Sequence, residues 1–164
     1  MNTRDITSSL TTLFGELVNG APREGGYMLN PGDEGLLRSL DKVTAAEASV
    51  TTPTGASIGA HTDHVRYGLS LMNRWAGGDG KAFDNADWGA SWRKTTVTDG
   101  EWQQLRNNLR GEAIRWLEEM RTPRDVSETD LNGLMGSVGH LAYHLGAIRQ
   151  INQNARGPRE GSKV

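Results

Sequence analysis

Residues 127–151 read SETDLNGLMGSVGHLAYHLGAIRQI, and the rest of the chain is organised around this stretch. Its apolar residues recur at spacings of three and four, which is typical of a helix packed against other helices. The residues of this apolar stripe are Leu131, Leu134, Val138, Leu141, Leu145 and Ile148. Ser127 stands where it can cap the helix, and acidic residues follow in the first turn, where the helix dipole favours them. We therefore expect a long helix here.

Two histidines, His140 and His144, lie at the edge of this stripe. Residues four apart on a helix point the same way, roughly 5–6 Å apart at Cβ. Two imidazoles so placed can share one metal ion. Position 141 is leucine, so the glutamate base of the zinc-protease motif HExxH is missing. The pair indicates a candidate metal site that needs a third ligand and a pocket from elsewhere in the chain.

Length and composition limit the class of protein. The chain has 164 residues, which predicts one domain with a real core. Its net charge of −2, without a basic cluster, argues against a nucleic-acid partner. It has no cysteine, so any metal must be bound by nitrogen and oxygen. It also lacks an apolar run of about 18 residues and a signal-like N-terminus. We expect a cytoplasmic protein that does not associate with membranes.

Apolar periodicity and Gly/Pro breakers divide the chain into helices. The expected helices span residues 3–18, 36–48, 57–76, 98–122 and 127–152. The connection 77–97 is long and carries two tryptophans, so we expect it to pack over one end of the core. These elements predict an all-α bundle, one domain over residues 1–155, followed by a flexible tail over 156–164.

A second pair of histidines, His61 and His64, lies on the expected helix 57–76. Both fall within the buried arc of that helix, so helical geometry leaves either one as a third ligand. A lone histidine on such a face is more often a hydrogen-bonded core residue. An i, i+4 pair that meets an inward histidine from a second helix instead favours a metal site.

Two segments carry a family resemblance: SIGAHTDHVRYGL at residues 57–69 and HLAYHLGAIRQI at residues 140–151. With the order of the helices, they resemble the DinB/YfiT-like superfamily of metal-dependent enzymes. Members of that family begin the second bundle helix with Ser or Thr and place a ligand histidine seven residues later. Ser57 and His64 match this spacing.

The last bundle helix of the family carries H-x3-H followed by a Gly-Gln pair. His140, His144 and Gly146 match this pattern, whereas Ala147 stands in place of the glutamine. The pieces WGASW and EWQQL within residues 88–105 also resemble the tryptophan-bearing middle of some members. The resemblance covers most of the chain.

The resemblance implies a four-helix bundle with up-down-down-up connections, here with an additional short helix and the long tryptophan-bearing loop. It implies that His64, His140 and His144 bind one divalent ion, commonly nickel or zinc, and so favours His64 over His61. It further implies a metal-dependent enzyme acting on a small molecule. The family includes hydrolases and transferases that use low-molecular-weight bacterial thiols such as mycothiol or bacillithiol.

A three-histidine site leaves the ion its full charge and at least one open position, which suits activation of water, a carbonyl or a thiolate. Because the ligands must be neutral, affinity should fall below a histidine pKa near 6.5. One alternative is a non-catalytic stress-response protein that binds a metal or small ligand. A further one is a helical interaction protein whose histidines bind nothing. A cleft beside the ion would favour the enzyme, and a closed site with four protein ligands would favour the binding protein.

The residues near the histidines give no clear catalytic group. We rank packing or solvated roles ahead of catalysis for Asp63, Tyr67 and Tyr143. Arg66 and Arg149 could bind an anionic substrate, but a solvated face explains them equally well.

We expect a homodimer, because the family is often dimeric and aromatic residues are enriched at interfaces. Four tryptophans give more aromatic surface than a core of this size obviously needs: Trp88, Trp92, Trp102 and Trp116.

Overall fold

The structure is a computed structural model that describes residues 3–53, 55–122 and 124–159, where helices are the only regular secondary structure. The helices are α1 (Thr3–Asn19), α2 (Gly35–Asp41), α3 (Ala45–Ala48), α4 (Ile58–Ala76), the 3-10 helix η1 (Ala90–Trp92), α5 (Asp99–Arg121), α6 (Glu128–Ile151) and the 3-10 helix η2 (Gln153–Ala155). The all-α class is confirmed. Residues 160–164 of the expected tail lie outside the described residues.

Side-chain caps determine where three of the long helices begin. Ser57 Oγ accepts a backbone hydrogen bond from the first turn of α4. Ser127 and Asp130 bond reciprocally to each other's backbone at the start of α6, and Thr98 and Glu101 do the same at the start of α5. Each arrangement satisfies backbone N–H groups that the helix itself leaves unpaired. The starts expected near 57, 98 and 127 are confirmed.

The prediction of a single helix over residues 36–48 is wrong. The chain forms two helices there, because Thr44 adopts an extended backbone (φ −75°, ψ 162°) and closes a capping box with Glu47. A capping box starts a new helix, and the Thr-x-x-Glu pattern of residues 44–47 carries that signal. The indole Nε1 of Trp102 donates to the carbonyl of Val43 at 2.7 Å, which ties the break to α5.

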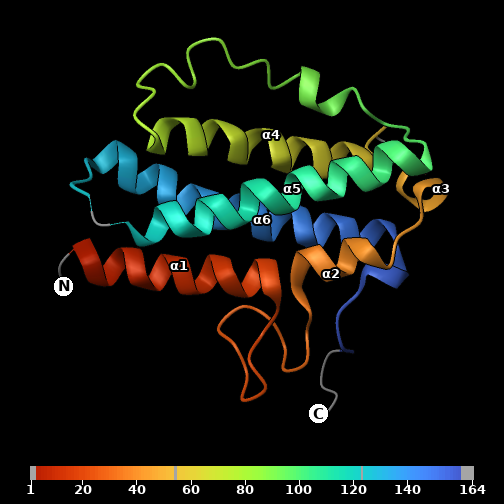
Figure 1. The fold of residues 1–164 in the computed structure, drawn as a ribbon. Helices are drawn as coiled ribbons and strands as arrows, with labels where there is room; N and C mark the ends of the chain where they lie inside the picture. The colour runs from red at the N-terminus through yellow and green to blue at the C-terminus, as the bar shows by residue number, and fades with distance from the viewer. Residues whose placement is uncertain (1–2, 54, 123, 160–164) are drawn as a thin grey trace.

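The four long helices pack side by side. α1 contacts α5 and α6, and α4 contacts the same two helices. Figure 1 shows that α1 and α6 run in one direction and that α4 and α5 run in the other. Because α4 and α5 are parallel, the connection 77–97 must return along the length of the molecule. It does so along the outer side of α4, with η1 packed against that helix, and not over one end of the core as expected.

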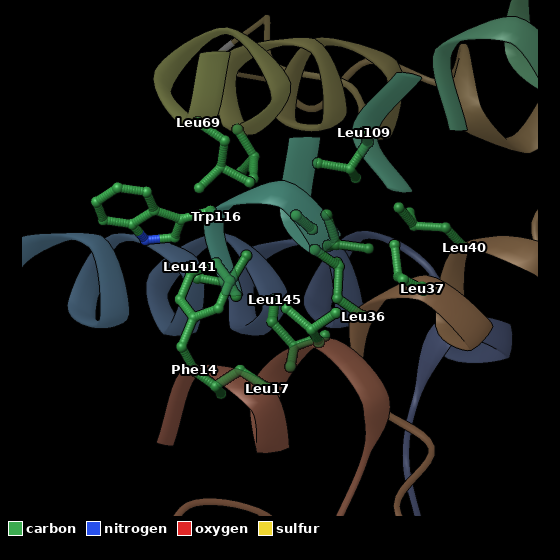
Figure 2. Packing of buried hydrophobic residues seen from close by; sticks show 14 of the residues in the cluster. Phe14, Leu17, Leu36, Leu37, Leu40, Leu69, Leu109, Trp116, Leu141 and Leu145 are labelled. Atoms are coloured by element: carbon green, nitrogen blue, oxygen red, sulfur yellow. The ribbon is translucent and has the colours of Figure 1, made fainter. Parts of the chain in front are cut away.

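The apolar stripe of α6 faces the centre of this arrangement. In Figure 2, Leu141 and Leu145 lie between the α1 side chains Phe14 and Leu17 and the residues of the neighbouring helices. All of these side chains are buried. No helix among the described residues is long and apolar enough to cross a membrane.

The structure accounts for most of the tryptophan surface within one chain. Trp102 and Trp116 are buried in the core, and the indole of Trp116 donates to Ser137 Oγ at 3.1 Å. Trp92 is partly buried against the histidines described below, whereas Trp88 is 41% exposed. The tryptophans therefore give little reason for an interface, and the homodimer stays a prediction.

Candidate metal centre

Three histidines from two helices point their Nε2 atoms at one another. His140 Nε2 on α6 lies 3.1 Å from His64 Nε2 on α4 and 3.0 Å from His144 Nε2 one turn further along α6. The ligand atoms of all three lie within 4.8 Å of one another. For nitrogen–metal bonds of about 2.0–2.1 Å, neighbouring ligand nitrogens lie about 2.9–3.4 Å apart in octahedral to tetrahedral geometry. The two distances from His140 Nε2 fall within this range, as expected if His140 shares an ion with each of the other two histidines.

A hydrogen-bond chain assigns the tautomer of His64. Ser91 Oγ lies 2.7 Å from His64 Nδ1 and donates its only hydrogen to the carbonyl of Trp88, also at 2.7 Å. His64 Nδ1 must therefore be the donor to Ser91, because the serine has no second hydrogen to give. In neutral His64 this leaves Nε2 without a hydrogen, with its lone pair facing the other two histidines.

This tautomer makes a purely hydrogen-bonded cluster impossible. His140 Nε2 contacts both His64 Nε2 and His144 Nε2. If His140 Nε2 carries a hydrogen, it can donate to only one of them and has no lone pair left to accept from His144. If it carries none, it faces the bare His64 nitrogen. At most one of the two contacts is thus a hydrogen bond between neutral rings. A cation at the centre satisfies all three lone pairs, so the donor set fits a metal ion.

His61 lies on the far side of the His144 ring from this cluster. Its Nδ1 is 2.8 Å from His144 Nδ1, whereas His144 presents Nε2 to the other two histidines. The structure therefore groups His64, and not His61, with His140 and His144. When His144 Nδ1 donates to His61, His144 Nε2 is free to bind a metal, so His61 can hold the required tautomer.

No protein-family model, curated protein or solved structure matches this chain.

Burial lowers the pKa of every imidazole in the group. It brings the pKa of His64 to about 4, with a smaller contribution from the charge of His140. The pKa of His144 falls to about 2 for the same two reasons. Trp92 contributes to this burial, since its ring stacks on His64 with centroids 4.4 Å apart and an interplanar angle of 27°. The rings are thus neutral at pH 7, which is the form that binds metals.

The other candidates from the sequence have partners away from the cluster, except Tyr143. Asp63 accepts from Arg66 Nε at 2.7 Å, and the Arg149 guanidinium binds Asp33. The hydroxyl of Tyr67 accepts from the backbone N–H of residue 87 at 3.0 Å. The ring of Tyr143 is 65% exposed and packs edge-on against His144, with ring centroids 4.9 Å apart. These contacts give all five candidates packing or surface roles.

Sequence reasoning did not find Ser91 or the stacking role of Trp92. Both lie on η1, which reaches the histidines only because the connection 77–97 folds back along α4. The two tryptophans of that connection signalled an ordered loop, but no local pattern linked Ser91 to a histidine 27 residues earlier.

We expect Ser91→Ala to weaken metal binding about 10- to 100-fold, the usual cost of removing a group that orients a ligand histidine. Without the hydroxyl, His64 Nδ1–H loses its acceptor and the ring can rotate or change tautomer. Ser70→Ala is the matched control. Like Ser91, Ser70 donates its hydroxyl hydrogen to the backbone carbonyl three residues earlier, at 2.7 Å, but it contacts no histidine. Titration calorimetry with Zn²⁺ measures both. Equal affinities for the two variants would refute the orienting role.

Metal binding should persist to a lower pH than the unshifted histidine pKa near 6.5 predicts. Three unshifted histidines at pH 6.5 would all be neutral in only about one eighth of the molecules. Because each folded-state pKa is lowered, protons compete with the ion only at more acidic pH. We expect the affinity to fall much less than eightfold between pH 8 and pH 6.5, and then to decline below that. An eightfold loss already at pH 6.5, measured by calorimetry, would contradict the lowered pKa values.

Proposed function

We propose that this protein binds one divalent metal ion through His64, His140 and His144 and is a metal-dependent enzyme of the DinB/YfiT-like superfamily. One observation carries the proposal: three Nε2 atoms converge in a cluster whose contacts cannot all be hydrogen bonds between neutral rings. The spacing from Ser57 to His64 and the H-x3-H of α6 support the family assignment. The directions of the four long helices support it too, since they follow the family's connection order.

The composition of the site favours an enzyme over a closed binding site. Among the described residues, the cluster consists of these three histidines, with no carboxylate or fourth imidazole as a further ligand. A divalent ion held there supplies Lewis-acid chemistry, which polarises a carbonyl or lowers the pKa of a water or thiol. The chain itself holds the ion, while Ser91 and His61 orient two of the ligand rings. Trp92 keeps water from one face of His64.

We propose a hydrolase or a transferase that uses a low-molecular-weight bacterial thiol, with zinc or nickel as the ion, since imidazole ligands suit both metals. The test begins with elemental analysis of the purified protein. Chelator-treated protein is then reloaded with Zn²⁺ or Ni²⁺ and screened for ester and amide hydrolysis and for conjugation of mycothiol or bacillithiol. We expect activity only in reloaded protein, and none in His64→Ala. Stoichiometric metal without either activity would favour the non-catalytic alternative.

A further inference from the structure

A cleft of about 210 Å³ opens directly beside the histidine cluster. It lies between α4 and α6 under the connection 77–97, and the ring of His140 forms part of its wall. His140 is only partly buried, unlike His64 and His144. The histidine that lines the cleft is therefore the most accessible of the three histidines in the cluster.

The remaining wall is mostly apolar. Met72 of α4 and the partly exposed rings of Phe83 and Trp88 line it. Ser137 also lines it, but its hydroxyl already donates to the carbonyl of Leu134 and accepts from the indole of Trp116. An apolar wall of this kind binds uncharged groups, because a charged group would lose its hydration without gaining a partner.

Two glycines of α6 create the space. A Cβ at Gly136 would meet no atom within 4 Å, and one at Gly133 would meet only the Met72 methyl at 3.8 Å. Gly133, Met72 and Phe83 also line a second hollow of about 280 Å³, so the two hollows adjoin along α6. For comparison, an apolar cavity of about 150 Å³ binds benzene. The first hollow alone has room for a substituted aromatic ring.

We propose that this cleft binds the uncharged, apolar part of the substrate, an aromatic ring or a group of similar size, and places its polar reacting group at the histidine cluster. The placement of the reacting group at the histidine cluster rests on the proposed function, whereas binding of the apolar part in the cleft does not. The aromatic and methionine walls recognise the ring, and the shared wall at His140 sets the direction in which its substituent points.

The test uses 4-fluorobenzyl alcohol as a neutral probe and 4-fluorobenzylammonium as its charged analogue, both observed by fluorine NMR. Gly133→Leu and Gly136→Leu fill the cleft from α6, and leucine is the better helix former, so both variants should fold. Gly111→Leu is the matched control, since Gly111 is an exposed helical glycine on α5 whose Cβ would also meet nothing within 4 Å. Affinities are measured on chelator-treated protein.

We expect the alcohol to bind at least tenfold more tightly than the ammonium. We also expect Gly133→Leu or Gly136→Leu to weaken its binding at least tenfold, with Gly111→Leu unchanged. In the cobalt-loaded protein, the paramagnetic ion should broaden the resonance of the bound probe, and His144→Ala should remove that broadening.

Equal binding of the two probes, or unchanged binding in both cleft variants, would overturn the inference whether or not metal binds. Stoichiometric cobalt with bound probe but no broadening would overturn the placement of the ligand beside the ion. Probe binding with the expected glycine dependence, but without cobalt binding, would overturn the proposed function instead and leave the apolar cleft standing.

Discussion

His144→Ala should abolish stoichiometric metal binding, the largest effect we expect from any single substitution at the site. His144 supplies one of the three Nε2 atoms of the cluster, and its side chain is buried. With two imidazoles left, the chelate loses one of its three nitrogen donors and binds the ion too weakly to keep it through purification. Elemental analysis after gel filtration, with calorimetry against Zn²⁺, measures the loss.

His61→Ala is the matched comparison, because it removes a buried histidine that contacts His144 but offers no atom to the cluster. We expect about 10- to 100-fold weaker binding with stoichiometry retained. If His61→Ala removed the metal while His64→Ala kept it, the ligand set would be wrong although a site exists. Parent-like binding in His64→Ala, His140→Ala and His144→Ala would refute the site itself.

Arg149→Met should lower the free energy of unfolding by about 3–5 kcal/mol, the usual cost of leaving one partner of a buried ion pair alone. The guanidinium makes two parallel hydrogen bonds to Asp33, of 2.8 and 2.7 Å, and the two side chains are only 15% and 4% exposed. Asp33 also accepts from the backbone N–H at the start of α2. The unpaired carboxylate would remain buried where α6 meets α2.

Two variants make this stability prediction sharp. Arg74→Met breaks an exposed ion pair with Asp79, which solvent screens, and should lower the stability far less than Arg149→Met. Asp33→Asn combined with Arg149→Met removes the buried charge as well and should recover part of the loss. Urea unfolding followed by circular dichroism measures all three. An Arg149→Met protein as stable as Arg74→Met would contradict the buried pair.

The helices could be predicted because their signals are local. The stripe of α6 and the caps at Ser57, Thr98 and Ser127 each depend on residues within a few positions of one another. The break between α2 and α3 was also local, and it was missed because the apolar pattern continued across the capping box at Thr44.

The site was only partly predictable, because its remaining contacts join residues that are far apart in the sequence. Periodicity placed His61 and His64 on the same buried arc, and only the family resemblance favoured His64. Both contact α6, but His64 Nε2 faces His140 Nε2, whereas His61 Nδ1 faces the other nitrogen of His144. Likewise, Arg149 looked like a surface cation or an anion-binding group until the chain placed Asp33, 116 residues away in sequence, against it. Sequence spacing on one helix cannot report such pairings.

The histidine cluster joins α4 to α6 through residues 76 positions apart, in a chain that contains no cysteine. An ion bound there acts as a reversible cross-link, doing for this protein what a disulfide does in an oxidising compartment. Because the unfolded chain does not hold the three rings together, a free ion at about 1,000 times its dissociation constant would stabilise the folded state by about 4 kcal/mol. The survival of this protein against heat and proteolysis would then follow the supply of metal around it.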